Sequence, residues 1–296
     1  YLKRGLSVGV PLALACGTLW GLALRFSTQD LKDSLRLQAK SQVQASLEVV
    51  SGAVRAEIQS VVQQTRETVS QKLDPQLSQE QRPWVPQGPT RGPASAAAEQ
   101  GWAFVEMQPD FLDVSVWVAR GVPAQIPKRI QVGMNSRFVE PSSRWADRLM
   151  KAEDNERQLV QVALMGHRVA ASEPLADGGT FLFLALPDDR RSGSESRILT
   201  THIRLERFQH AFRRVGDGGL MDGAPQMIAF LDSAGNVLGH PDFRHVLRRE
   251  SWFKSTLFQE ARRSPASHGV ISVHDTQERD WLLGFEKLGF GSLYVL

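Results

Sequence analysis

The sequence predicts an α+β protein in which a membrane-anchored helix precedes two similar modules built on antiparallel sheets. Three observations carry this prediction. An uncharged apolar run near the start is followed by a long amphipathic segment without proline. Beyond that segment, two stretches of the chain repeat one order of elements, which is two strands, helices and three strands. Antiparallel sheets that are covered by helices on one face form an α+β fold.

The apolar run from Gly5 to Leu24 contains 20 residues and no charge. About 20 apolar residues span the hydrocarbon core of a bilayer as a helix, so residues 1–26 are predicted to form a transmembrane helix. Lys3 and Arg4 precede the run, and an excess of basic residues marks the cytoplasmic side of a membrane helix. We therefore expect the residues after about 26 to lie on the other side of the membrane.

A secretory signal is the alternative interpretation of the same segment. Basic residues, an apolar stretch and small residues describe such a signal, and residues 13–16 (Ala-Leu-Ala-Cys) are similar to a bacterial lipoprotein cleavage site. The leucine lies one place from where that pattern requires it, and the apolar run continues for eight residues after Cys16. An uncleaved anchor is therefore favoured. Because the chain opens on Tyr1 and not on methionine, we expect it to be a piece of a longer protein.

Residues 27–73 are predicted to form a long stalk helix. Ser27 can cap a helix start, and Asp30 is favourable at the positive end of the helix dipole. From Val43 to Val61 the apolar residues are spaced by three or four positions, so they line one helical face. Such a helix would be about 65–70 Å long, which is more than one domain normally needs. An ordinary long surface helix is the alternative to a stalk that joins an outer domain to the bilayer.

Composition and motifs exclude several classes of function. A hydrophobic content of 42% and a charged content of 23% are typical of a globular protein. The single cysteine, Cys16, lies in the apolar run, so the outer part has no disulfide, thiol nucleophile or cysteine metal site. The net charge is only +3 and the arginines are spread in pairs, which argues against nucleic acid as a partner. No zinc, phosphate-loop or nucleophile-elbow motif occurs, so we expect neither a cofactor nor an enzymatic activity in this segment.

Residues 74–215 are predicted to form the membrane-distal module. Five prolines between 74 and 101 indicate an irregular connection, and the stretch 121–141 is typical of a loop. Alternating or continuous apolar segments predict the strands, and helices are expected over 140–152 and 205–214. The expected strands are, in order, 102–107, 112–118, 158–163, 180–186 and 197–205.

Residues 216–296 are predicted to form the membrane-proximal module, because four glycines within 215–225 mark a boundary between modules. A helical pattern over 243–263 is expected to bury Trp252 and Phe253 in the core. His240 and His245 are five positions apart, whereas metal ligands on one helix turn are three or four apart. No metal site is therefore expected, and His240 with Asp242 is expected to hold the turn that follows a strand. The expected strands are 226–231, 236–239, 269–274, 280–285 and 291–296.

The stretch 227–242 (Met-Ile-Ala-Phe-Leu-Asp-Ser-Ala-Gly-Asn-Val-Leu-Gly-His-Pro-Asp) is the most distinctive motif of the chain. With the repeated order of elements, it resembles the double Cache (PAS-like) family of bacterial extracytoplasmic sensor domains, which has a strand, an Asp-x-x-Gly turn, a strand and a His-Pro-Asp run. Residues 198–212 look like the family's link between its two modules. Residues 288–295 are similar to its last strand, after which a second membrane helix normally follows.

The resemblance implies a periplasmic ligand-sensing domain of a signalling receptor in the bacterial inner (cytoplasmic) membrane. Such receptors commonly carry a nucleotide cyclase, histidine kinase or chemotaxis module beyond the second membrane helix. The expected partners are a small-molecule ligand, the lipid bilayer and a second copy of the chain. A ligand shifts the equilibrium between arrangements of a sensor when it binds them with different affinity, and the stalk helices of the homodimer would carry the change. The alternative is a membrane-anchored envelope protein that binds the cell wall or a protein partner without signalling.

A ligand pocket is expected in the distal module, between its sheet and the loops of residues 121–148. Aromatic walls combined with a few ionisable groups are typical of small-molecule pockets. The candidate ligand-binding residues are Trp117, Arg144, Trp145, Asp147, Arg148 and His167. Amino-acid-binding members of the family carry an Arg/Trp/Tyr/Asp signature, from which the spacing of residues 144–148 departs, and Arg144 and Arg148 also fit a solvated helix face. The class of ligand therefore stays open.

Overall fold

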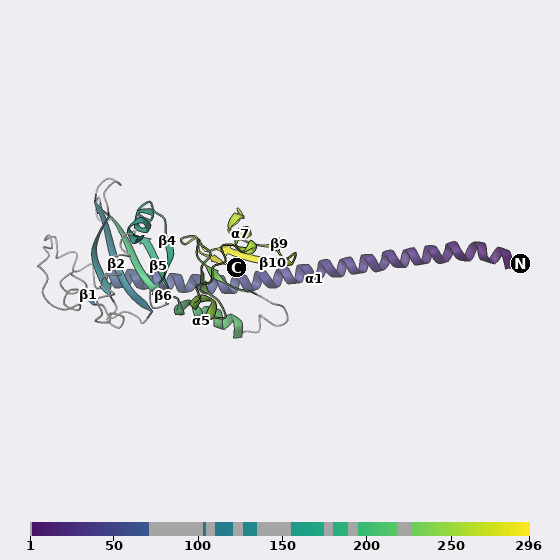
Figure 1. Ribbon diagram of the computed structural model, residues 1–296, viewed down its shortest axis with the longest axis horizontal. Helices are drawn as coiled ribbons and strands as arrows, with labels where there is room; N and C mark the ends of the chain where they lie inside the picture. The colour runs from purple at the N-terminus through teal and green to yellow at the C-terminus, as the bar shows by residue number, and fades with distance from the viewer. Residues whose placement is uncertain are drawn as a thin grey trace, which may run out of the picture.

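The computed structural model describes residues 2–70, 103–104, 110–120, 127–134, 155–174, 180–188, 195–217 and 227–296. A single long helix, α1 (Leu2–Thr68), runs through the whole molecule and carries two sheet-containing parts along it (Figure 1). The side chains of α1 are described from residue 29 onward. Within the described part of the chain, no helix meets the length and apolarity that a membrane crossing requires. The transmembrane helix predicted for residues 1–26 lies outside the described side chains and stays a prediction.

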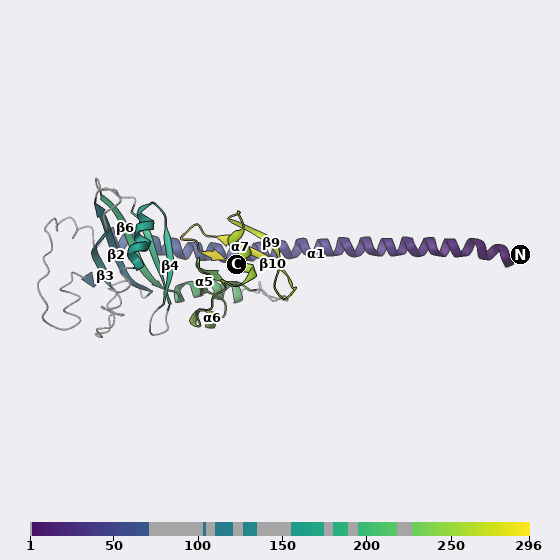
Figure 2. The same cartoon turned by 45° about the horizontal axis from the view of Figure 1, so that its top comes forward.

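The helix α1 projects beyond the sheets at its N-terminal end and joins the hydrophobic core at its C-terminal end. Residues 29–38 are all exposed, and both views show this part of the helix standing free of the sheets (Figure 2). Farther along, Val50, Val54 and Val61 are completely buried. The long helix predicted over residues 27–73 therefore has two parts. Its N-terminal part is exposed, and its later part packs its apolar face against both sheets.

The first sheet has six strands in the order β1-β3-β2-β6-β5-β4. All neighbours are antiparallel except β1 and β3, which are parallel. One face packs on α1 through residues such as Val116 and Leu184, and the other face packs on a helix at residues 155–164. The strands are β1 (Ala103–Phe104), β2 (Phe111–Arg120), β3 (Lys128–Met134), β4 (Val169–Pro174), β5 (Thr180–Pro187) and β6 (Glu195–Arg204).

Two predictions for this sheet are wrong. Residues 158–163 form part of the helix at 155–164 and not a strand. Glu156, Val160 and Ala163 are all completely buried, and their spacing of four and then three residues lets one helical face cover the sheet. The strand β3 occupies residues that were predicted as a loop. The helix predicted over 140–152 lies outside the described residues.

The second sheet has five antiparallel strands in the order β8-β7-β11-β10-β9. The helix α5 (Glu206–Asp217) follows β6 and leads toward this sheet. The strands are β7 (Phe230–Leu231), β8 (Val237–Gly239), β9 (His268–His274), β10 (Asp280–Lys287) and β11 (Tyr294–Val295). The α+β prediction, with antiparallel sheets and an N-terminal helix, is thus confirmed.

The helical segment predicted over 243–263 is two short helices, α6 (Arg244–Leu247) and α7 (Thr256–Arg263). Between them, Ser251 forms a β-bridge with Asn236, which interrupts the helical hydrogen bonding. Trp252 packs against the core as expected, but Phe253 is 46% exposed, so its prediction as a core residue is wrong. The backbone of Phe253 instead approaches Gly235, which has a φ of 77°. A Cβ atom at Gly235 would lie 2.7 Å from the Phe253 nitrogen, so the turn requires glycine.

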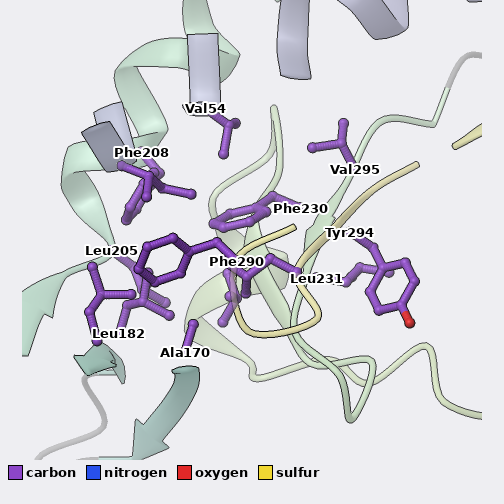
Figure 3. Packing of buried hydrophobic residues seen from close by; sticks show 14 of the residues in the cluster. Val54, Ala170, Leu182, Leu205, Phe208, Phe230, Leu231, Phe290, Tyr294 and Val295 are labelled. Atoms are coloured by element: carbon purple, nitrogen blue, oxygen red, sulfur yellow. The ribbon is translucent and has the colours of Figure 1, made fainter. Parts of the chain in front are cut away.

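One hydrophobic cluster joins α1 with both sheets (Figure 3). Val54 of α1, Leu182 of the first sheet and Phe230 of the second sheet belong to it. A polar contact crosses the same junction, because the Ser172 hydroxyl on β4 donates to Asp232 Oδ2 at 2.5 Å, ahead of β8. The two sheets and α1 therefore share a core, and a shift of one sheet must be accommodated by the others.

Candidate functional site

A buried polar cluster lies on the face of the first sheet that is covered by the helix at 155–164. Side chains alternate between the two faces of a strand, so β2 directs Val114 and Val116 toward the α1 side and Asp113, Ser115 and Trp117 toward the other. The registers with the neighbouring strands set Asp113 opposite His202, Ser115 opposite Thr200 and Trp117 opposite Arg129. We call the seven residues of this face and its covering helix the polar cluster. They are Asp113, Ser115, Trp117, Arg129, Glu156, Thr200 and His202.

Asp113 is at the centre of the polar cluster and is only 2% exposed. Its Oδ1 accepts the backbone N–H of His202 at 3.1 Å and lies 2.9 Å from the Nδ1 of the same residue. Its Oδ2 lies 3.5 Å from Arg129 Nη2 and accepts no hydrogen bond from any described residue. A buried oxygen without a donor costs free energy, so this atom is suited to accept a donor from a ligand.

Arg129 connects the sheet with the covering helix. Its Nη2 and Nε donate to Ser115 Oγ at 2.6 and 3.2 Å, and its guanidinium lies 5.6 Å from the centre of the Trp117 ring. The completely buried Glu156, on the helix at 155–164, places its carboxylate 3.9 Å from Arg129 Nη2 and 3.7 Å from His202 Nε2. The helix therefore closes the polar cluster with a second carboxylate.

The charges of the polar cluster are set by these neighbours. Burial by itself would raise the pKa of Asp113, but the His202 imidazole, with its charge and hydrogen bonds, and the Arg129 guanidinium lower that pKa below its ordinary value of 3.8. Asp113 is therefore an anion in this site. Within the described residues, the Arg129 guanidinium lies 3.5 Å from the Asp113 carboxylate and 3.9 Å from the Glu156 carboxylate. A cationic group on a ligand could pair with Asp113, because a buried charge requires a partner.

Aromatic and small apolar side chains border the polar cluster. Trp117 is completely buried and donates its indole N–H to Thr200 Oγ1 at 3.1 Å. The Phe183 ring on β5 lies 5.1 Å from the His202 ring. Val160 and Ala163 of the covering helix pack against the Trp117 side of the sheet. The face thus combines a charged end with an apolar, aromatic end, as binding sites for small amphipathic molecules do.

The sequence-predicted ligand residues are placed unequally. Trp117 lies in the polar cluster. His167 is exposed, in the segment between the helix at 155–164 and β4, and is not part of the cluster. Arg144, Trp145, Asp147 and Arg148 lie outside the described residues and stay predictions.

Sequence reasoning missed the ionisable members of the polar cluster, which are Asp113, Arg129, Glu156 and His202. One signal was available for Asp113, because it is a charged residue at an alternate position of the strand predicted over 112–118. Burying an ionised side chain in a sheet requires partners, so this position could have been selected. Arg129 gave no such signal, because it lies in a stretch that is predicted as a loop. Glu156 gave none either, because it lies ahead of the strand predicted over 158–163, where the structure has a helix that begins at residue 155.

A hollow of about 550 Å³ lies between α1 and the second sheet. Its walls include Val43, Ser46 and Leu47 of α1 with Trp252 and Trp281 from the second sheet's side. These walls are mainly apolar, and the ionisable residues Arg279 and Asp280 at this hollow are exposed. The buried charges that could select a polar ligand lie in the polar cluster and not here.

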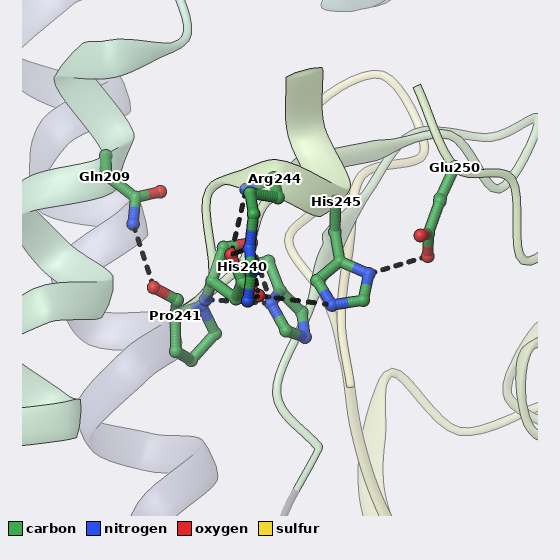
Figure 4. A network of polar contacts seen from close by, with 7 residues as sticks. Gln209, His240, Pro241, Arg244, His245 and Glu250 are labelled. Atoms are coloured by element: carbon green, nitrogen blue, oxygen red, sulfur yellow. Dashed lines mark hydrogen bonds and ion pairs between the residues drawn. The ribbon is translucent and has the colours of Figure 1, made fainter. Parts of the chain in front are cut away.

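The histidine-containing loop after β8 serves the local structure (Figure 4). His240 Nδ1 accepts the backbone N–H of Asp242 at 3.0 Å, as predicted for this turn. Burial and the nearby charge of His245 lower the pKa of His240, and the two rings are 4.1 Å apart. His245 pairs with Glu250 at 2.7 Å, and Gln209 of α5 donates to the Pro241 carbonyl at 3.3 Å. The loop is therefore fastened to α5.

No family model and no curated protein matches this chain. Among solved structures, it is similar to the ligand-binding domain of the Pseudomonas aeruginosa PAO1 amino acid chemoreceptor PctC in complex with GABA, with 15% identity, 87% of this chain and 97% of that chain covered, and a TM-score of 0.44. It is also similar to the ligand-binding domain of the Campylobacter jejuni chemoreceptor Tlp3 in complex with L-valine. The identity is 10%, the match covers 90% of this chain and 94% of that chain, and the TM-score is 0.44. A third similar structure is the extracellular domain of the histidine kinase soHK1S-Z6. The identity is 12%, the match covers 91% of this chain and 95% of that chain, and the TM-score is 0.40.

These neighbours are ligand-binding or extracellular domains of chemoreceptors and histidine kinases, and none of the three is a catalytic domain. They are of the kind that the resemblance to double Cache sensor domains implies. Because the TM-scores are below 0.5, the function proposed below rests on the residues of this chain.

Proposed function

We propose that this chain is the ligand-sensing domain of a bacterial membrane receptor and that its ligand is a small molecule with a cationic nitrogen, bound at the polar cluster. The observation that carries the proposal is the Asp113 carboxylate. It is buried and ionised, and its Oδ2 lacks a hydrogen-bond donor among the described residues. An ammonium group would donate to this oxygen and pair with the Asp113 carboxylate. The role of the segment is therefore binding and not catalysis.

The same side chains can bind the rest of such a ligand. Arg129 donates hydrogen bonds to the uncharged Ser115 Oγ and lies 3.5 and 3.9 Å from the Asp113 and Glu156 carboxylates, so part of its guanidinium can turn to an anionic or carbonyl group of a ligand. The Trp117 and Phe183 rings provide an apolar wall. Trp117 is thus the one predicted site residue that the proposal uses directly, while residues 144–148 and His167 stay candidates for the outer part of the pocket.

A mechanical route from the polar cluster to α1 supports a sensing role. The strand β6 carries His202 in the cluster and Ile203 in the core that contains α1. Two residues after Leu205, Arg207 of α5 donates to Glu57, Ser60 and Gln64 of α1 at 3.0, 2.9 and 3.1 Å. A ligand that moves β6 would therefore displace α1, provided that it binds the two arrangements with different affinity.

In this proposal residues 1–26 anchor the chain in the inner membrane and the rest lies in the periplasm. Residues 74–215 form the distal module, 216–296 form the proximal module, and two copies of the chain form a homodimer. The free N-terminal part of α1, over residues 29–38, would connect the sensor with the bilayer. A change in α1 would then reach an output module on the cytoplasmic side.

The test is calorimetric titration of the purified chain with a panel of amines, amino acids and matched carboxylic acids that lack the nitrogen. We expect at least one cationic member to bind, and Asp113→Asn to abolish its binding. Asp275→Asn is the control, because Asp275 is also an aspartate with a largely covered side chain, 12% exposed, but it lies in the turn before β10 and far along the chain from the polar cluster. Binding only of compounds without a cationic nitrogen, or equal binding by Asp113→Asn, would overturn the proposal. No binding across the panel would favour an envelope protein that contacts a protein or the cell wall.

A further inference from the structure

The hollow between α1 and the second sheet has the size of a small-molecule site. Its volume of about 550 Å³ lies within the roughly 300–1,000 Å³ of ligand pockets. One wall is α1 from Ala39 to Leu47, directly after the exposed part of the helix, and the opposite wall includes β10 and β11. Both views show the second sheet beside this part of α1 (Figures 1 and 2). The hollow is therefore separate from the polar cluster, which lies on the first sheet.

The lining residues divide into a buried bottom and an exposed mouth. Leu47 of α1, Leu283 of β10 and Val295 of β11 are 7%, 5% and 0% exposed. Gln42 and Met227, which also line the hollow, are exposed. A small molecule can therefore enter from solvent at the mouth, and its apolar atoms would leave water at the bottom, which is favourable.

The hollow lies beside a close contact and is not a general gap between α1 and the second sheet. A Cβ atom at Gly284 of β10 would lie 2.8 Å from Val43 Cγ1 and 3.7 Å from Leu47 Cβ. Farther along the same two elements, Arg55 of α1 pairs with Glu286 of β10. These contacts hold the helix and the strand together, so the hollow has fixed walls.

Ser46 supplies a buried hydroxyl without a partner. It lines the hollow and is 5% exposed, and its Oγ makes no hydrogen bond to any described residue. Two other buried hydroxyls of α1 bond to the helix itself. Thr65 Oγ1 donates to the Val61 carbonyl at 2.8 Å, and Ser51 Oγ donates to the Glu48 carbonyl at 3.4 Å. A buried polar atom without a partner costs free energy, so the Ser46 hydroxyl is suited to a polar group that enters the hollow.

Two tryptophan side chains, Trp252 and Trp281, give the hollow an aromatic lining. The Trp281 indole N–H already donates to Asp275 Oδ2 at 2.9 Å. Trp281 therefore offers a ligand its ring and not a hydrogen-bond donor. Aromatic rings attract other rings in offset or edge-to-face arrangements, so this lining favours an aromatic ligand.

The ionisable residues at the mouth are paired with their neighbours. Arg279 Nε donates to Asp275 Oδ2 at 2.8 Å, and Asp280 Oδ1 lies 2.6 Å from His274 Nδ1. Arg279 and Asp280 are the only ionisable residues among the described side chains that line the hollow. A charged group that entered would lose water without gaining a charged partner, which is unfavourable. The hollow therefore selects against charge.

We propose that the hollow is a ligand site separate from the polar cluster, and that it takes an uncharged aromatic molecule with one hydrogen-bonding group, such as a phenol. The ring of this ligand packs on Trp252 and Trp281. Its polar group pairs with Ser46 Oγ, which can both donate and accept a hydrogen bond.

Such a ligand contacts α1 and the second sheet at once. It therefore stabilises the arrangement of the two that keeps the hollow open, relative to any arrangement in which the hollow is closed. The proposal does not depend on the polar cluster or on the ligand of the polar cluster.

The test is a titration of the full chain with three matched probes, followed by quenching of tryptophan fluorescence. The probes are 2-naphthol, which is uncharged at neutral pH, naphthalene, which lacks the polar group, and 2-naphthoate, which is charged. We expect saturable binding of 2-naphthol that is tighter than the binding of either other probe. No saturable binding of 2-naphthol would overturn the proposal. Naphthalene or 2-naphthoate binding as tightly as 2-naphthol would overturn the assigned ligand class.

Two variants place the probe in the hollow. Ser46→Ala should weaken the binding of 2-naphthol about 2–10-fold, which is the worth of one hydrogen bond, without lowering Tm, because it removes a buried hydroxyl that has no partner. Ala39→Trp should abolish binding, because its ring would fill the hollow. Ser41→Ala and Ser41→Trp are the controls, since Ser41 is exposed on α1 and does not line the hollow. Binding that is unchanged in both Ser46→Ala and Ala39→Trp would refute the site.

Asp113→Asn separates this proposal from the sensor function of the polar cluster. We expect this variant to bind 2-naphthol as wild type does, although it should no longer bind a cationic ligand. Loss of 2-naphthol binding in Asp113→Asn would show that the probe occupies the polar cluster and would overturn the present proposal alone. A wild-type chain that binds 2-naphthol but no amine would count against the polar cluster alone.

Discussion

Replacing Arg207 with methionine should weaken the attachment of α5 to α1 more than any surface substitution of the same kind. Arg207 is only 9% exposed, and its guanidinium makes three hydrogen bonds to α1 at 2.9 to 3.1 Å. It also lies 5.7 Å from the centre of the Phe111 ring on β2. Methionine keeps much of the aliphatic stem and therefore removes mainly the polar contacts.

The expected loss of stability follows from those contacts. A hydrogen bond to a charged group contributes about 1.5–3 kcal/mol, but Glu57 and its neighbours on α1 are partly exposed, so solvent screens the ion pair and can replace the lost donors. We therefore expect the free energy of unfolding to fall by about 2–3 kcal/mol. In a thermal scan this corresponds to a decrease in Tm of roughly 4–12 °C.

The assay is urea unfolding of the full chain, with Arg244→Met as the matched control. Arg244 is 75% exposed and pairs with Asp242, two residues away, so its replacement should cause no measurable change. A double-mutant cycle with Glu57→Gln should give a coupling energy of about 0.5–1.5 kcal/mol. A loss below about 0.5 kcal/mol for Arg207→Met, which is the range of ordinary surface substitutions, would refute the idea that this arginine clamps α5 to α1.

Three further predictions concern stability at single positions. The pKa of Asp113 is lowered in the folded protein, so its ionised form stabilises the fold above its unfolded pKa of 3.8, and that stability is lost as the pH falls through the lower folded value. In acid titrations followed by circular dichroism, Asp113→Asn should remove this part of the pH dependence of stability. A pH profile that is the same in wild type and variant would contradict this prediction. Gly235→Ala should lower the free energy of unfolding by about 2–4 kcal/mol, since it combines backbone strain with a clash against the backbone of Phe253. Gly289→Ala is the control, because Gly289 has a φ of 67° but open space around it, and it should lower the free energy of unfolding by only about 1 kcal/mol. Equal losses for the two variants in urea unfolding would exclude the clash. Ser172→Ala removes the hydroxyl that donates to Asp232 across the junction of the sheets and should cost about 1 kcal/mol, with no effect expected if that contact is absent in solution.

Local periodicity in the sequence determined much of the fold. The three- and four-residue spacing from Val43 to Val61 predicts a helix, and the alternation around Val114 and Val116 predicts a strand, because each pattern reports which side chains must leave water together. The Asp-x-x-Gly motif at 232–235 predicts a turn, because glycine is needed where the backbone has a positive φ. Such features depend on neighbours in the chain, so they can be recognised without the tertiary structure.

Other elements were decided by what they pack against. The apolar residues within 158–163 are compatible with a strand, and only the sheet face beneath them favours a helix that buries Glu156 and Val160 together. The segment 243–263 likewise has an amphipathic pattern, but the bridge between Asn236 and Ser251 divides it. Short apolar segments carry both periods weakly, so burial selects between them.

Residue patterns along the chain therefore predict an α+β fold with a long helix at its start, and they include Trp117 among the candidate ligand residues. The meeting of Asp113, Arg129, Glu156 and His202 on one face of one sheet follows from the folded structure alone. These four residues come from three strands and a helix and are up to 89 positions apart. Their chemistry depends on burial and on mutual distance, and neither quantity is contained in the order of residues along the chain.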